Sequence, residues 1–200
     1  AGVGNCASAL VQGVEYYKNA KEETTVPGLM HVKFGGYHVR DVRFVAAFDV
    51  NKNKIGKDLA DAIWAEPNVC ERFGKAEVPK TGVRVLPGPI LDGVAPHMKE
   101  PFHTYDEKRM KPVDGAESLR EAEADVLVNF IPVGSGKATR AYAEACLRAK
   151  CALANCIPEF IASDPSWAKR FESAGLPVAG DDIKSQLGAT ILHRNIVKLC

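Results

Sequence analysis

Apolar residues follow two patterns that alternate along the chain. Ala7, Leu10, Val11 and Val14 recur at the spacing of one helical face. Later, short and nearly all-apolar runs are typical of strands buried on both faces of a parallel sheet. These runs lie at 42–48, 83–86, 125–131, 151–156 and 177–180.

Helical signals separate the apolar runs. An apolar stripe spans 55–63, and Asp114 with Glu117 forms a capping-box pattern. Ser135 is expected to cap the next helix, and Asp164-Pro165 and Gly175 to start and stop the one after it. This alternation predicts an α/β fold with a doubly wound parallel sheet.

Two stretches interrupt the alternation. Residues 19–41 are rich in turn residues and are expected to form a loop or insertion. At the start, Gly2 to Ala7 spell G-x-G-x-x-A, a turn that normally follows a strand. We therefore expect a first strand to be missing and the chain to stop within a further helix, as in a protein truncated at both ends.

The composition is that of an ordinary globular protein. Of 200 residues, 46% are hydrophobic and 26% charged, and the net charge is +1. That balance gives no electrostatic reason to expect nucleic acid or a membrane as partner. No apolar stretch is long enough to span a bilayer. Six cysteines do not form a disulfide scaffold, so a reducing cytoplasm is expected, and neither the cysteines nor the histidines predict a metal site.

The opening turn is a candidate for binding a dinucleotide. Gly2 would permit the tight turn, Gly4 the approach of a pyrophosphate, and Ala7 close packing of helix and strand. The helix that follows would direct free N–H groups and a positive dipole end at the phosphates. A purely structural glycine turn is the alternative.

Acidic and small residues at other strand ends extend the candidate site. Asp49 ends the run 42–48, where a carboxylate would accept the adenosine ribose hydroxyls and favour NAD over its 2′-phosphorylated form. It could instead cap the next turn. Asp58 is expected on a solvated helix face. The IPVGS segment would line the nicotinamide half of the cofactor or form a plain strand-to-helix turn.

The segment GDDIKSQ, residues 180–186, follows the last apolar run. Asp181, Asp182, Lys184 and Ser185 crowd the end of a strand, where a polar site would explain them. Lysine beside carboxylates can act as a general acid or stabilise an oxyanion. A helix cap with solvated charges is the alternative.

Five segments together resemble the inositol-3-phosphate synthase family, in its shorter actinobacterial and archaeal branch. They are GVGNCASALVQGVEYY, VPGLMHVKFGGYHVRDVRFVAAFDV, IPVGS, FIASDPSWAKRF and GDDIKSQLGATILHR. The resemblance covers essentially the whole chain. It implies an NAD-dependent isomerase of glucose 6-phosphate, in which C5 is oxidised, C6 is enolised, the ring closes on C1 and the keto group is reduced again.

The resemblance also assigns residues and domains. It implies cofactor contacts at Gly2, Gly4, Asn5, Cys6 and Ala7 of the turn and at Asp58, Ala122, Tyr142 and Ser185, and an active-site wall at Asp182 and Lys184. Residues 1–185 would form the Rossmann-like NAD-binding domain. Residues 186–200 would begin an α+β catalytic domain that builds a homotetramer, and the fragment alone would be inactive because further lysines of the family follow later.

Two other functions are compatible with the residues alone. A homoserine- or aspartate-dehydrogenase-like oxidoreductase would share the fold and release NADH, whereas the isomerase ends with NAD unchanged. A non-catalytic NAD-binding module would bind the cofactor without converting glucose 6-phosphate.

Overall fold

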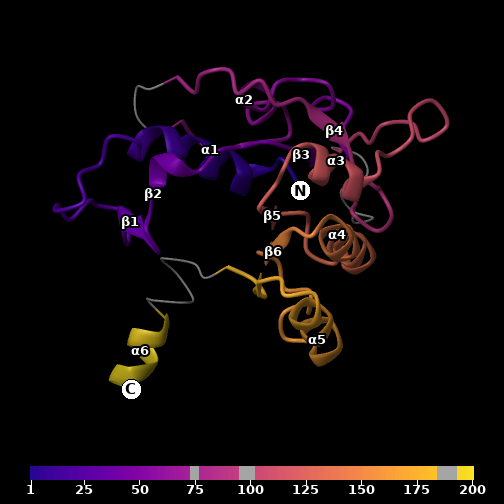
Figure 1. Ribbon diagram of the computed structural model, residues 1–200. Helices are drawn as coiled ribbons and strands as arrows, with labels where there is room; N and C mark the ends of the chain where they lie inside the picture. Colours follow the sequence, from indigo (N-terminus) through magenta and orange to yellow (C-terminus); the bar gives the residue numbers. More distant parts are fainter. Residues whose placement is uncertain (73–76, 95–101, 184–192) are drawn as a thin grey trace.

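The computed structural model describes residues 1–72, 77–94, 102–183 and 193–200 of an α/β protein (Figure 1). The helices are α1 (Asn5–Tyr17), α2 (Leu59–Ala62), α3 (Gly115–Glu121), α4 (Gly136–Ala149), α5 (Pro165–Ser173), α6 (Arg194–Leu199) and the short 3-10 helix η1 (Val39–Asp41). The strands are β1 (Lys33–Phe34), β2 (Tyr37–His38), β3 (Ala47–Asp49), β4 (Val85–Pro87), β5 (Val126–Asn129), β6 (Ala152–Asn155) and β7 (Val178–Ala179).

The central strands form two parallel sheets that the first residues of the chain connect. One sheet pairs β3 with β4, and the other has the order β5-β6-β7. Between them, the nitrogen of Ala1 donates to the oxygen of Val128 and its oxygen accepts from the nitrogen of Phe130, each at 2.8 Å. On the other side, the N–H of Gly2 donates to the oxygen of Phe48 at 2.8 Å. The resulting order is β4-β3, residues 1–2, then β5-β6-β7.

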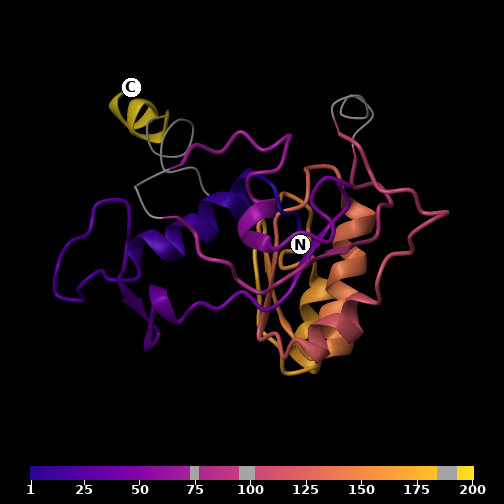
Figure 2. The same ribbon diagram turned by 90° about the horizontal axis from the view of Figure 1, so that it is seen from above.

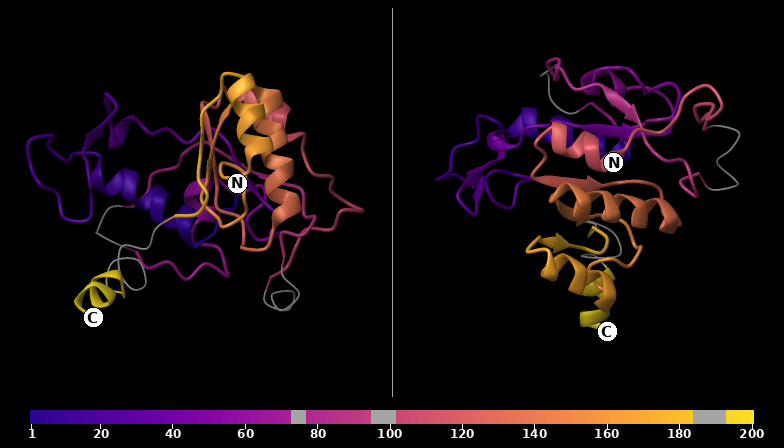
Figure 3. Two further views of the ribbon diagram at one scale, coloured as in Figure 1. Left: turned by 90° about the horizontal axis from the view of Figure 1, so that it is seen from below. Right: turned by 45° about the vertical axis from the view of Figure 1, so that its right-hand side comes forward.

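Both faces of this layer are covered, as the all-apolar runs predict. Ala47 and Phe48 are successive residues of β3 and belong to two different core clusters, because side chains alternate across a strand. Figures 2 and 3 show α3, α4 and α5 together on one face, with α1 on the other. Phe48, Leu127 and Leu153 pack with the first group of helices, whereas Ala47 packs with α1 and α2.

The insertion and the strand lengths differ from the sequence expectations. Residues 19–41 are not a plain loop, since they contain the antiparallel hairpin of β1 and β2, followed by η1. The apolar run 42–48 forms a strand only from Ala47, which pairs with Val85, the first residue of β4. Val42 and Val45 there are 46% and 44% exposed.

The helix boundaries follow their capping residues, with one exception. Asp164 accepts from the first N–H groups of α5, and Gly175 adopts a positive φ of 67° just after it, as predicted. Asp114 caps α3 in the same way. At α4 the prediction was wrong: the Ser135 side chain makes no cap bond, and Asp92 from a distant loop takes its place.

The chain ends in α6, which lies apart from the sheet (Figure 3). The expected domain boundary after residue 185 falls within 184–192, outside the described residues. None of the described helices is long and apolar enough to cross a membrane.

Candidate functional site

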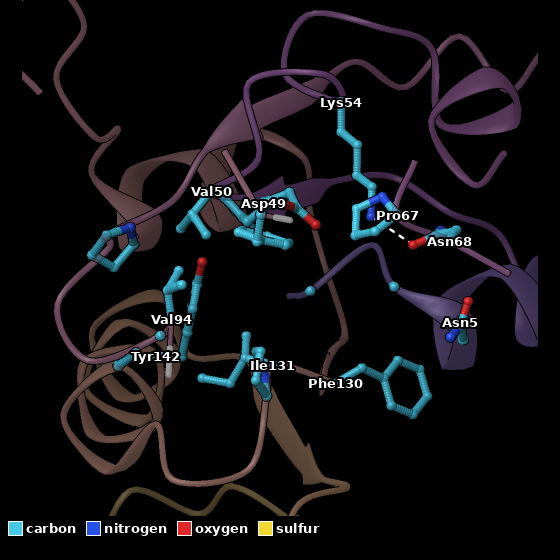
Figure 4. Close-up of a pocket in the computed structure, with 18 residues that line it drawn as sticks. Asn5, Asp49, Val50, Lys54, Pro67, Asn68, Val94, Phe130, Ile131 and Tyr142 are labelled. Carbon is cyan, nitrogen blue, oxygen red and sulfur yellow. Dashed lines mark hydrogen bonds between the residues drawn. The ribbon is translucent and has the colours of Figure 1, made fainter. Parts of the chain in front are cut away.

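A cavity of about 290 Å³ lies at the carboxyl ends of β3 and β5, where the chain turns into α1 and α4 (Figure 4). In parallel sheets, ligands bind at this edge. Its lining residues are Gly2, Gly4, Asn5, Phe48, Asp49, Val50, Lys54, Pro67, Asn68, Pro89, Gly93, Val94, Phe102, Phe130, Ile131, Pro132, Ala138 and Tyr142.

The two glycines of the opening turn have different surroundings. Gly2 has a φ of 82°, and a Cβ there would lie 2.7 Å from the carbonyl carbon and oxygen of Phe130. Packing against β5 therefore requires glycine at this position. A Cβ on Gly4 would meet no atom within 4 Å, and the φ of Gly4 is −91°, which any residue can adopt. Nothing within the described chain therefore requires glycine at position 4.

The start of α1 also differs from the starts of the neighbouring helices. Asp58, Asp114 and Asp164 cap α2, α3 and α5. Asp92 caps α4 from a distant loop, since its carboxylate accepts from two N–H groups of that helix. In the described chain, α1 and the short α6 are the helices without a side-chain cap, and α1 begins at Gly4 on the cavity wall. Among the described residues, no side chain therefore caps the positive end of α1, which faces the cavity, although Asp49 accepts from Val3 just before it.

The other residues of the turn hold or flank this helix start. The side-chain oxygen of Asn5 accepts from the N–H groups of Val69 and Cys70, at 2.8 and 3.1 Å, and so fixes a covering loop. Cys6 is exposed and Ala7 half-buried in the first turn of α1.

Asp49 lies where its sequence position predicts, at the end of β3 and on the cavity wall. Its two oxygens accept from the N–H groups of Val3 and Asn51, both at 2.7 Å. The bond to Asn51 is the turn cap that formed the alternative interpretation. A carboxylate oxygen can accept more than one hydrogen bond, so the turn cap at Asp49 is compatible with a further contact to a ligand.

Lys54 also lines the cavity, and the sequence patterns did not single it out. It is 1% exposed, and its ammonium donates to the oxygen of Val3 and to Oδ1 of Asn68, each at 2.7 Å. Burial lowers the pKa of Lys54, and the charge of Asp49 opposes that change. No sequence pattern predicts this burial, because a lysine in a polar loop normally has a solvated side chain. Lys54 is buried because residues 66–68 fold over the turn.

Tyr142 comes from α4 and directs its hydroxyl into the cavity (Figure 4). The side chain is 3% exposed and its ring packs against Phe48. Burial, with smaller contributions from Asp49 and Tyr105, raises the pKa of Tyr142 above the usual tyrosine value. The hydroxyl is therefore protonated at neutral pH and can donate a hydrogen bond to a ligand.

Asp58 and Ala122 lie outside the cavity lining. Asp58 is not on a solvated helix face, as its position alone had indicated, but precedes α2 and accepts from Ala60, Thr81 and Gly82. Burial raises the pKa of Asp58, and these hydrogen bonds outweigh burial and lower it overall. Ala122 ends α3, just before β5 begins. The cofactor contacts that the resemblance implies for both residues stay predictions.

Asp181 and Asp182, which follow β7, lie in different environments. Asp181 accepts from Nδ2 of Asn155 at 2.7 Å and from three successive backbone N–H groups at 161–163. Asp182 is exposed, and its N–H donates to the oxygens of Asn155 and Ile157 at 3.1 Å. Lys184 and Ser185 lie outside the described residues, so the expected lysine–carboxylate cluster stays a prediction.

Comparison with known proteins gives close relatives. The chain is 57% identical over 199 residues to an inositol-3-phosphate synthase of Corynebacterium glutamicum, covering 100% of this chain and 53% of that protein. It is also 57% identical over 198 residues to the synthase of Mycolicibacterium smegmatis, with 99% and 53% covered. No protein-family model matches the chain.

Two solved structures share the fold. The crystal structure of Ari2 superposes with a TM-score of 0.83 at 39% identity, covering 99% of this chain and 57% of that one. A myo-inositol-1-phosphate synthase-related protein from Thermotoga maritima gives a TM-score of 0.69 at 26% identity, covering 99% and 56%.

Fold and site define an α/β protein whose cavity lies at the carboxyl ends of parallel strands, beside the start of α1. The relatives make the assignment specific. The chain belongs to the inositol-3-phosphate synthase family and spans about half the length of the curated relatives it matches.

Proposed function

We propose that this chain is the NAD-binding half of an inositol-3-phosphate synthase. The observation that carries the proposal is the start of α1, where Gly4 borders open space and no side chain of the described residues caps the helix. A dinucleotide pyrophosphate would accept from the N–H groups of this helix start, and its approach would explain why glycine stands at position 4.

The strand order supports the same proposal. With residues 1–2 bonded between β3 and β5, the order β4-β3-(1–2)-β5-β6-β7 matches that of a doubly wound dinucleotide-binding sheet. In such a sheet the order reverses at the central strand, and the cofactor lies at that point. The cavity lies there too, at the ends of β3 and β5.

In the proposed site, the chain's own groups bind and orient the cofactor. The turn Gly2–Ala7 would hold the pyrophosphate, Asp49 would accept from the adenosine ribose, and the Tyr142 hydroxyl would donate to the part of the cofactor that extends toward α4. When bound, NAD supplies an acceptor for the hydride of an oxidised alcohol and returns that hydride later. Asp182, Lys184 and Ser185 are proposed to adjoin the substrate.

The whole protein is proposed to convert D-glucose 6-phosphate to 1D-myo-inositol 3-phosphate. A cytoplasmic location and a homotetramer are part of this proposal. Cys146 and Cys151, buried as free thiols, are compatible with a reducing compartment. The tetramer rests on the resemblance and stays a prediction.

Calorimetry with the full-length protein tests the cofactor site. Gly4→Val should weaken NAD binding at least about tenfold, because a branched side chain would occupy the phosphate position. Gly13→Ala, in the same helix and with no atom near its Cβ position, should leave the affinity unchanged. Equal affinity of Gly4→Val and the native protein would count against the assignment.

Product analysis tests the reaction. Glucose 6-phosphate should yield inositol phosphate without net formation of NADH. Stoichiometric release of NADH would instead favour a dehydrogenase. NAD binding without any turnover of glucose 6-phosphate would favour a non-catalytic module.

A further inference from the structure

The strongest unexplained feature near the cavity is the buried ammonium group of Lys54. The side chain is 1% exposed, and the ammonium donates to Val3 and Asn68. Burying a charged group costs free energy unless strong partners compensate. Both of these partners are neutral oxygens, and Val3 already accepts from Nδ2 of Asn68 at 3.1 Å. Hydrogen bonding alone therefore does not require a cation at this position.

Lys54 and Asp49 bind the same residue of the glycine turn, each through a different backbone group. Asp49 accepts from the N–H of Val3, and Lys54 donates to its carbonyl oxygen, both at 2.7 Å. Val3 lies between the two glycines of the turn, so fixing its peptide groups fixes the orientation of Gly4 at the start of α1. Figure 4 shows the ammonium of Lys54 beside Asn68 on the cavity wall.

We propose that Lys54 is a positioning residue for the cofactor, which fixes the Val3 peptide groups and supplies the positive charge that a bound pyrophosphate needs. The inference rests on the proposed NAD site. A dinucleotide brings two negative charges to the turn, and Asp49 alone would repel them. With Lys54 charged, the pair is neutral, and the helix dipole and the ammonium both favour the phosphates.

The protonation of Lys54 gives the inference a distinctive signature. Burial lowers the pKa of Lys54, and the negative charge of Asp49 opposes this change without cancelling it. The ammonium therefore loses its proton at a lower pH than an exposed lysine would. NAD affinity should fall as the pH rises through that pKa, since the neutral amine no longer balances Asp49.

The experiment measures the binding of NAD and of adenosine to the full-length protein by calorimetry. Lys54→Met keeps the apolar stem and removes the charge, and Lys52→Met, an exposed neighbour in the same loop, is the control. Lys54→Met should weaken NAD binding at least about tenfold, because it removes one positive charge from beside the two phosphates. Adenosine, which carries no phosphate, should lose less than about twofold. Lys52→Met should behave as the native protein.

Each outcome decides the inference. Equal loss of NAD and adenosine affinity would overturn the inference, because it would show a general disturbance of the site and not an effect at the phosphates. Unchanged NAD affinity would show that Lys54 does not act on the cofactor at all. If Lys54→Met does not fold, Lys54→Gln takes its place in the same comparison, because its amide can still donate a hydrogen bond but carries no charge. Unchanged NAD affinity of that variant would overturn the inference. Failure of the native protein to bind NAD would instead overturn the proposed function.

Discussion

The contrast between Gly2 and Gly4 gives a prediction in which stability and binding separate. Gly2→Ala places a Cβ 2.7 Å from Phe130 and 2.8 Å from the nitrogen of Ile131. These are backbone atoms at the end of β5, so they cannot rotate away as the end of a side chain could. Gly4→Ala places its Cβ in open space.

The magnitudes follow from these positions. A non-glycine residue at the φ of Gly2, 82°, costs about 1–2 kcal/mol. Relieving the overlap with β5 adds about 1–3 kcal/mol, so Gly2→Ala should lower the free energy of unfolding by about 2–5 kcal/mol. Gly4→Ala should lower it by no more than about 1 kcal/mol, the scale of a changed N-cap residue.

Urea unfolding followed by circular dichroism measures the free energy of unfolding, and calorimetry measures the affinity for NAD. We expect Gly2→Ala to unfold at clearly lower urea, and Gly4→Ala to remain near the native midpoint but bind NAD more weakly. A native-like midpoint for Gly2→Ala would refute the packing argument. A Gly4→Ala protein with native NAD affinity would refute the idea that the ligand requires this glycine.

Two further predictions concern helix caps. Ser135→Ala should change the free energy of unfolding by less than about 0.5 kcal/mol, because its buried hydroxyl has no partner in the described chain. In an Asp92→Ala background, where Ser135 can cap α4, the same substitution should lower the free energy of unfolding by about 1 kcal/mol. Additive effects of the two substitutions in thermal unfolding would argue against this exchange of caps. Asp58→Ala should destabilise the protein by about 1–2 kcal/mol at pH 7. Because the folded pKa of Asp58 is lowered, the part of this difference that depends on its charge should be fully present above the unfolded pKa of about 4 and be lost as the pH falls through the folded pKa. A urea midpoint difference that stays constant as the pH is lowered from about 7 into the acid range would contradict the reasoning.

Local signals in the sequence predicted the order of the elements well. The apolar stripe from Ala7 to Val14 forms α1, and the run 125–131 contains β5. Asp164 and Gly175 bound α5 as expected, because capping and left-handed turns depend on a few neighbouring residues. The hairpin of β1 and β2 was missed because its two-residue strands are too short to show a periodic pattern.

Sequence motifs led to part of the cavity wall, and the cofactor roles of those residues stay predictions. Gly2, Gly4, Asp49 and Tyr142 all line the cavity, through the glycine pattern, the strand-end position and the resemblance. Lys54 was missed, since its burial depends on residues 66–68, which fold over the turn from later in the chain.

The sequence by itself determined the alternating α/β plan and the glycine turn, because periodicity, capping and turn chemistry are local properties. The tertiary structure decided which groups satisfy one another across long separations. Within the part of the chain that the structure describes, Asp92 caps α4 in place of Ser135, and no side chain caps the start of α1 at the cavity. The tertiary structure also placed Val3 between Asp49 and Lys54, because a buried charge must find its partners wherever packing brings them.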